Sequence, residues 1–215
     1  YGYEDDTERF LAFQVAACDW MSKWQHSPDV IHCHDHHTGL IPFMVKYCFE
    51  FRQKLADVPT VLTVHNAQYQ GWIGWDKYYL LPPFDSWKWG MLDWADSINP
   101  LASAVKCAWK VTTVSHSYLD ELKEEANGLQ DLFQYEVGKS SGILNGIDNQ
   151  VWDPVTDSMI AKNYDKELVA KGKKKNKKEL AGQFGLDPDK PLIAFIGRLV
   201  GEKAADLLPE AIAQS

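Results

Sequence analysis

Short runs of β-branched and apolar residues alternate along this chain with stretches of helical periodicity, and this alternation constrains the fold more than any other feature. Such a pattern is typical of an α/β fold, in which a doubly wound parallel sheet has helices on both faces. The expected strands are Asp29–Cys33, Thr60–Val64, Lys110–Val114 and Ser141–Leu144. The expected helices are Thr7–Lys23, Gly39–Tyr47, Leu101–Ala108 and His116–Glu125. Ser115 is the expected N-cap of the last helix.

Two segments depart from this alternation. Residues 67–100 are long, rich in Trp and interrupted by Pro, which is typical of a functional loop or an insertion rather than a plain connector. Residues 150–190 are polar and rich in Lys, as in a linker with a polar helix. Pro191–Ile196 then has the pattern of a buried strand, and a helix is expected from about Glu202.

The length of 215 residues exceeds that of one domain of ordinary size. We therefore expect the later part of one Rossmann-like domain over residues 1–155, a linker with a polar helix over 156–190, and the start of a second Rossmann-like domain over 191–215. The chain begins without Met and stops directly after a helix-like run, so we expect it to be a piece of a larger protein.

Composition excludes several classes of protein. The chain has 30 acidic and 22 basic residues, and a net charge of −8 disfavours general binding of nucleic acid. No apolar run reaches the roughly 20 residues that a membrane span needs, so we expect no membrane contact. The basic run Lys171–Lys178 is expected to be a solvated face, with nucleic-acid or membrane contact as the alternative. Four separated Cys without a C-x-x-C pair favour free thiols in a reducing cytoplasm.

The densest group of chemically active side chains is the run H-x-H-D-H-H-T-G at His32–Gly39. It follows an expected strand, at the edge of the sheet where α/β folds bind ligands. We favour a polar loop whose His and Asp side chains hydrogen-bond a substrate. Structural histidines bonded to backbone carbonyls are the second interpretation. A zinc site is the third, and it is weakened because no second cluster completes the ligand set.

Three further motifs also follow expected strands. His65-Asn66 with Tyr69-Gln70-Gly71 offers groups that pair with sugar hydroxyls, although an ordinary polar turn has the same composition. Asn145-Gly146 is either a simple turn or an amide placed at a strand end. The segment Gly197–Lys203 brings an Arg and a Lys onto a strand-to-helix turn, where they are able to clamp a diphosphate unless they are two solvated cations.

Taken in order, these motifs resemble bacterial glycogen synthase and plant starch synthase, which are glycosyltransferases of the GT-B fold that use ADP-glucose. The resemblance rests on H-D-H-H-T-G-L-I-P from His34, T-V-H-N from Thr63, I-L-N-G-I-D from Ile143 with W-D-P from Trp152, and Arg198-Leu199 with Lys203. It runs from about Asp5 to the end of the chain. It assigns residues 1–155 to the N-terminal synthase catalytic domain and 191–215 to the C-terminal nucleotide-binding domain.

The resemblance implies a retaining transfer of glucose from ADP-glucose to the non-reducing end of an α-1,4-glucan, glycogen or starch. It implies no metal ion, and we expect no cofactor. It makes His37 the histidine that contacts the transferred glucose and Asn145 the asparagine on the amino-terminal side of the cleft. It makes Arg198 and Lys203 the pair that holds the diphosphate. The expected substrate-binding residues are Asp5, Asp35, Gly39, His65, Asn66, Tyr69 and Gln70.

The sequence also departs from the family pattern. The K-x-G-G loop near the amino terminus and the Glu-containing loop near the carboxyl terminus of the family are not present in this chain, so we expect the chain alone to be inactive. Ala204 stands where Gly usually follows the lysine, and His116 where Pro is common. The alternatives are a GT-B transferase for another nucleotide sugar, a non-catalytic α-glucan-binding module with a Trp-rich surface, and a metal protein built on the histidines.

Overall fold

The computed structural model describes residues 2–214, apart from the side chain of Glu202. The chain divides into two compact units, Tyr1–Gly146 and Ile147–Ser215, and each is described by itself. No helix within residues 2–214 combines the length and the apolar character that a membrane span requires. The assignment of the chain's parts to domains of a larger enzyme stays a prediction.

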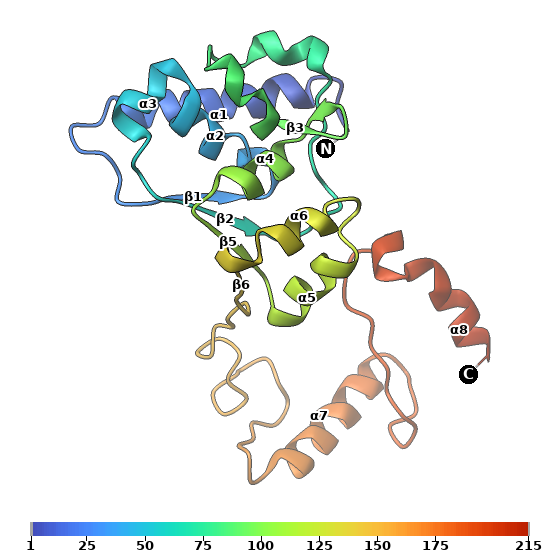
Figure 1. Cartoon of the computed structure of the whole chain (residues 1–215). Coiled ribbons are helices and arrows are strands. Elements are labelled where there is room, and N and C mark those ends of the chain that lie inside the picture. The colour runs from blue at the N-terminus through green and yellow to red at the C-terminus, as the bar shows by residue number, and fades with distance from the viewer. Residues whose placement is uncertain (1, 215) are drawn as a thin grey trace. The chain divides into compact units, whose positions relative to one another are not determined.

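A four-stranded parallel sheet forms the centre of the first unit (Figure 1). Its strands are β1 (Ile31–His34), β2 (Thr60–Val64), β5 (Lys110–Thr113) and β6 (Ser140–Gly142). They pair in the order β1-β2-β5-β6, and every pair is parallel. All four carboxyl ends therefore lie at one edge of the sheet. The predicted α/β class is confirmed, and β2 has the predicted bounds.

Helices flank the sheet, and they include two that the sequence analysis did not predict. The predicted helices are α1 (Asp6–Ser22), α2 (Ile41–Tyr47), α4 (Pro100–Cys107) and α5 (His116–Glu124). The additional helices are α3 (Phe49–Leu55) and α6 (Gln130–Tyr135), which are short. The extended backbone of Cys48 separates α3 from α2, and α3 buries Phe51 and Leu55 completely. Burying such side chains stabilises the fold by about 1.5–3 kcal/mol each, enough to hold a seven-residue helix.

Side-chain caps fix where two of these helices begin. The Ser115 hydroxyl accepts a hydrogen bond from the Tyr118 N–H at 2.9 Å, which confirms the predicted N-cap of α5. The Asn99 side chain accepts from the Ala102 N–H at 2.9 Å, with Pro100 at the first position of α4. Each cap satisfies a backbone donor that the helix leaves without a partner.

The long segment between β2 and α4 is folded rather than loose. It contains two 3₁₀ helices, η2 (Trp75–Leu80) and η3 (Ser86–Met91), and a hairpin of β3 (Asp93–Trp94) with β4 (Ser97–Ile98). Ile73 and Ile98 exchange backbone hydrogen bonds of 2.9 Å in both directions. The segment therefore brings a set of aromatic side chains onto the first unit in fixed positions.

Two predicted strands differ from the structure: one ends earlier than predicted, and the other is not a strand. Strand β6 ends at Gly142, not Leu144, and Ile143 and Leu144 are 59% and 71% exposed. Residues 191–196 are irregular, and Ile193 and Ile196 are 89% and 95% exposed. A strand needs a neighbour to bond its backbone, and none of the described residues of the second unit forms one. Apolar composition alone therefore does not make this segment a strand.

The regular elements of the second unit within residues 147–214 are all helical, and the rest of it is irregular. The unit contains the predicted polar Lys-rich helix, α7 (Val169–Gln183), and ends in α8 (Leu208–Gln214). Two single 3₁₀ turns, η5 (Gly201–Lys203) and η6 (Ala205–Leu207), precede α8, so the last helix begins later than predicted. Ala204 lies between these turns with φ of 52°, in the left-handed region that favours glycine.

Gly142 allows β6 to approach the start of α5, and this contact predicts a strong effect of mutation. A Cβ at this position would lie 2.4 Å from the Cα and N of His116. We expect Gly142→Ala to lower the free energy of unfolding by about 1–3 kcal/mol, because backbone atoms must move to make room. Gly138→Ala is the matched control, since a Cβ there meets no atom within 4 Å. Equal urea midpoints for both variants would contradict the prediction.

Candidate active site

The site is built on the loops that leave β1 and β2 at the carboxyl edge of the sheet. Register pairs His34 with Thr63, so the residues that follow each strand emerge side by side. A 3₁₀ turn, η1 (His36–Thr38), follows β1 immediately. The Thr38 hydroxyl accepts from the His34 N–H at 2.6 Å and donates to the His34 carbonyl at 2.9 Å. These two hydrogen bonds hold the histidine-rich turn against the end of its own strand.

Asp35 joins the two loops. Its carboxylate accepts hydrogen bonds from the backbone N–H groups of His65, at 2.7 Å, and Asn66, at 3.4 Å. Its own N–H donates to the Thr63 carbonyl at 3.0 Å. Asp35 adopts φ of 51°, which is uncommon for a residue with a side chain. The structure thus gives Asp35 an internal role as a clamp; its predicted contact with substrate stays a prediction.

Histidine and threonine side chains form a ladder across the exposed face of the sheet. His34 Nδ1 lies 3.0 Å from His65 Nε2, so one ring donates to the other. His32 Nε2 lies 2.7 Å from the Thr63 hydroxyl, which lies 2.7 Å from the Thr112 hydroxyl. Burial, followed by the nearby His32 and His65, lowers the pKa of His34. A neutral ring is what the His34–His65 hydrogen bond requires.

His36 and His37 are half-buried and lie next to each other, with ring centroids 3.8 Å apart. His36 Nδ1 lies 3.0 Å from the Tyr69 carbonyl, which ties η1 to the second loop. The edge of Phe10 from α1 packs against the His37 ring, with centroids 4.8 Å apart. Burial is the largest effect on both rings and lowers the pKa of each. The two rings are therefore mainly neutral at pH 7.

A pocket of about 340 Å³ opens between the first turn of α1 and the loop at residues 68–73. His36, Phe10 and Tyr69 line it, together with Asp6 and the half-exposed Trp72. Aromatic rings beside a carboxylate, an imidazole and an amide form the mixed apolar and polar lining that small-molecule sites have. The sequence analysis missed Phe10, because its helical spacing resembles that of an ordinary core residue.

Gln70 and Gly39, two of the predicted substrate-binding residues, are buried within the fold. The Gln70 amide accepts from Asn99 at 2.7 Å and donates to the carbonyls of Ala67 and Asn127, at 3.1 and 3.0 Å. A Cβ on Gly39 would lie 2.5 Å from the Pro100 carbonyl oxygen, so only glycine lets these segments meet. Gln70 also lines the pocket, and the predicted contact of both residues with substrate stays a prediction.

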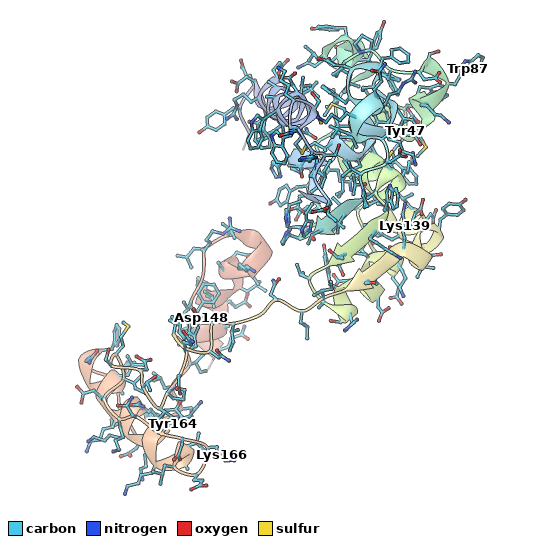
Figure 2. The ribbon with its side chains drawn as sticks, turned by 90° about the vertical axis from the view of Figure 1, so that its left-hand side faces the viewer. Tyr47, Trp87, Lys139, Asp148, Tyr164 and Lys166 are labelled. Atoms are coloured by element: carbon cyan, nitrogen blue, oxygen red, sulfur yellow. The ribbon has the colours of Figure 1, made fainter. Side chains whose placement is uncertain are left out.

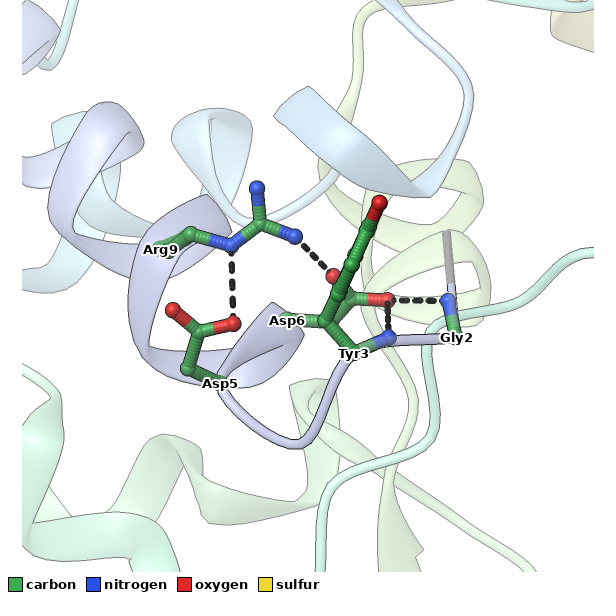
Figure 3. Close-up of polar contacts among 5 residues, drawn as sticks. All are labelled: Gly2, Tyr3, Asp5, Asp6 and Arg9. Atoms are coloured by element: carbon green, nitrogen blue, oxygen red, sulfur yellow. Dashed lines mark hydrogen bonds and ion pairs between the residues drawn. The ribbon is translucent and has the colours of Figure 1, made fainter.

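Asp6, in the first turn of α1, lines the pocket. Figure 3 shows the polar contacts that Asp6 and its neighbours make. Asp5 Oδ1 lies 3.1 Å from Arg9 Nε, and Asp6 forms an ion pair with the same guanidinium. Asp6 also accepts from the N–H groups of Gly2 and Tyr3, at 2.7 and 3.2 Å. Arg9 therefore fixes both carboxylates in position, and Asp5 remains largely exposed with its side chain 64% accessible.

The other predicted catalytic residues lie outside this cluster. Asn145 is exposed in the irregular segment after β6, in the first unit. Arg198 and Lys203 are exposed in the second unit, Arg198 in the irregular segment and Lys203 in η5. The structure thus brings Asp35, His37, His65, Asn66 and Tyr69 together on the loops after β1 and β2. Tyr69 and Gln70 line the pocket, and Asp5 precedes Asp6 of its lining. Within residues 2–214, no group of three His, Cys, Asp or Glu side chains is arranged to hold a metal ion.

Residues 1–135 match the family model of the starch synthase catalytic domain. The chain belongs to this family. It is similar to the glycogen synthase of Flavobacterium johnsoniae, 56% identical over 213 residues that cover 99% of this chain and 45% of the relative. It is 37% identical to the glycogen synthase of Streptococcus gordonii over 220 residues, which cover 99% of this chain and 46% of the relative.

A solved structure gives the same result for the fold. The catalytic domain of starch synthase IV from Arabidopsis thaliana, bound to ADP and acarbose, has a TM-score of 0.80 and 30% identity to this chain. The match covers all of this chain and 45% of that one. The resemblance stated from the motifs is confirmed. This synthase-family chain spans about half the length of the curated relatives it matches.

The clamp by Asp35 predicts a graded response to mutation. Asp35→Ala leaves two backbone N–H groups without their acceptor, so we expect a loss of about 1–3 kcal/mol in the free energy of unfolding. Asp35→Asn keeps one side-chain oxygen as acceptor and should lose less. Eight of the nine tryptophans lie in the first unit, so their fluorescence during urea unfolding measures the free energy of unfolding of each variant. A larger loss for Asp35→Asn than for Asp35→Ala would contradict the role as an acceptor.

The lowered pKa of three histidines predicts that stability falls on mild acidification. The pKa of His34, His36 and His37 lies below the ordinary 6.5 in the folded chain. Between the lowered pKa and 6.5, the unfolded chain binds protons that the folded chain does not, so unfolding is favoured as pH falls. We expect a lower urea midpoint at pH 5.5 than at pH 7.5. His36→Gln should reduce the difference in urea midpoint between the two pH values. If that difference is unchanged in the variant, groups other than His36 cause it.

Proposed function

We propose that the chain is part of a retaining glucosyltransferase that moves glucose from ADP-glucose to the 4-hydroxyl at the non-reducing end of an α-1,4-glucan. The carbon–oxygen bond between glucose C1 and the diphosphate breaks, a bond from C1 to the acceptor oxygen forms, and the hydroxyl proton leaves with the released ADP. Membership of the starch synthase catalytic domain family supports this reaction. The reducing cytoplasm is the compartment we propose, since all four cysteines are free and buried.

The observation that carries the proposal is the junction of the β1 and β2 loops. There the Asp35 carboxylate holds the His65–Asn66 loop against the turn that contains His37. A neutral, half-buried His37 is suited to accept or donate a hydrogen bond to a sugar hydroxyl without introducing charge. Phe10 packs on its ring and fixes its position. The adjoining pocket, with Tyr69 and Asp6 in its wall, suits a sugar ring.

We assign the diphosphate to Arg198 and Lys203. Negative charge develops on the diphosphate as the bond to C1 breaks, and fixed cations stabilise that charge most when water is excluded. The guanidinium of Arg198 is able to bind two phosphate oxygens at once, and the ammonium of Lys203 adds a point charge. Asn145 is assigned to the same side of the cleft as His37, as an amide that hydrogen-bonds the sugar.

The role of His37 is tested in a protein that joins this chain to the remaining half of the family's length. We expect His37→Ala to lower kcat by about 10²-fold or more, as loss of a group that acts at the transition state does. His26→Ala, at an exposed position away from the pocket, is the control. Transfer of labelled glucose from ADP-glucose to glycogen measures the rate.

Each of two outcomes would contradict one part of the proposal. Equal rates for His37→Ala and the unchanged protein would remove His37 from the reaction. Turnover by the 215-residue chain alone, at a rate comparable with the longer protein, would contradict the expectation that this chain is inactive by itself. We expect no such turnover, because the K-x-G-G loop and the Glu-containing loop of the family are not present in this chain.

A further inference from the structure

Side chains from elsewhere in the first unit bond three consecutive backbone N–H groups of the loop after β2. Asp35, which follows β1, accepts from the first two, those of His65 and Asn66, at 2.7 and 3.4 Å. The third, the Ala67 N–H, donates to the hydroxyl of Tyr118 at 3.0 Å. Tyr118 lies in the first turn of α5, the helix that follows β5. The loop therefore has a second anchor besides Asp35.

The strand order explains why the two anchors come from different neighbours of β2. In the sheet β2 lies between β1 and β5, so its loop is flanked by the chain that follows each of them. The carboxyl ends of these parallel strands all lie at one edge. The Ser115 cap fixes where α5 begins, because its hydroxyl accepts from the Tyr118 N–H. The start of the helix thus positions the tyrosine beside the loop.

Burial makes the bond between Ala67 and Tyr118 one that water does not readily replace. Ala67 is only 1% exposed, and a buried N–H without an acceptor is costly. The ring of Tyr118 packs against the hydrophobic core. Burial also raises the pKa of Tyr118, so its hydroxyl keeps its proton at pH 7. A rigidly packed, neutral hydroxyl therefore holds this part of the loop.

The residue between the two anchors is Asn66, one of the predicted substrate-binding residues. Its side-chain oxygen accepts from the Gln68 N–H at 2.9 Å, which orients the amide. The two N–H donors of the same amide then remain for a ligand such as a sugar hydroxyl. A shift of the backbone at Ala67 would displace these donors, and a displacement of about 1 Å is enough to slow a reaction strongly.

We propose that Tyr118 is a positioning residue for glucose transfer, whose hydroxyl holds the loop so that the Asn66 amide donates to a sugar hydroxyl in the reacting geometry. Tyr118 acts through Asn66 and does not touch the reacting atoms. This role rests on the proposed function. The anchoring of the loop is a property of the folded chain and is measured without substrate.

Amide hydrogen exchange in the whole 215-residue chain tests the anchor. Tyr118→Phe keeps the packed ring and removes only the oxygen. We expect the Ala67 N–H to exchange about tenfold faster or more in this variant, because it loses its acceptor. The His65 N–H, which Asp35 holds, should change less. An unchanged exchange rate at Ala67 would show that the hydroxyl does not hold the loop, and the proposal would be wrong.

Tyr47→Phe is the matched control, since it removes the same oxygen from another half-buried tyrosine. Figure 2 shows Tyr47 in the first unit, and it is the last residue of α2. Burial raises the pKa of Tyr47 as it does that of Tyr118, but its hydroxyl forms no hydrogen bond with another described residue. We expect this variant to change neither the exchange at Ala67 nor the rate of transfer.

A double-mutant cycle in the longer protein tests the role in transfer. We expect Tyr118→Phe to lower kcat/KM for transfer of labelled glucose about tenfold when Asn66 is present. In an Asn66→Asp background the same change should lower it by less than about twofold, because the amide donors are already gone. Asn66→Asp is chosen because a carboxylate oxygen still accepts from the Gln68 N–H.

The remaining outcomes separate this proposal from the proposed function. Equal losses from Tyr118→Phe in both backgrounds would show that the tyrosine does not act through Asn66, and the proposal would be overturned. Faster exchange at Ala67 with an unchanged kcat/KM would also overturn it, while the transfer reaction itself would stand. If the unchanged longer protein transfers no glucose from ADP-glucose, the proposed function fails and the role of Tyr118 in transfer fails with it.

Discussion

The candidate site depends on the hydrogen bonds that the Asp35 carboxylate accepts from the loop after β2. Parallel pairing brings the two strand ends together, but it does not fix the loops that continue beyond them. Asp35 does so at 2.7 Å from the His65 N–H, and its left-handed backbone turns the chain sharply into η1. The loop geometry at His37 follows from this contact, because the turn has no other carboxylate that bridges to β2 within the described residues.

The lowered pKa values of His34, His36 and His37 follow from the same packing. His34 and His65 lie 3.0 Å apart, and two protonated rings at that distance would repel each other and lose their shared hydrogen bond. Burial against Phe10 and the Tyr69 loop acts in the same direction on His36 and His37. His36 and His37 therefore offer mainly uncharged donors and acceptors, which suit the sugar ring of the proposed reaction.

The sheet and the histidine turn could be predicted from sequence because their signals are local. The run T-V-L-T-V predicts β2 with its observed bounds, and Ser115 predicts the start of α5. The short helices α3 and α6 could not be predicted, because tertiary burial of residues such as Phe51 and Phe133, not periodicity, stabilises them. Likewise, nothing in the sequence indicates that Phe10 packs on His37, since this contact joins the first helix to a later loop.

The segment from Pro191 to Lys203, which carries the two cations proposed to bind the diphosphate, shows that local sequence alone does not fix its backbone. Its apolar residues have strand propensity, yet a strand's hydrogen bonds lie with its neighbours, and residues 147–214 supply none. Ala204 adds a left-handed backbone worth about 1–2 kcal/mol of strain directly after Lys203. A cation pair has to be held rigidly to stabilise a developing diphosphate charge. Within residues 147–214 the apolar segment 191–196 thus has no strand partner, whereas hydrogen bonds within the first unit already order the loops after β1 and β2.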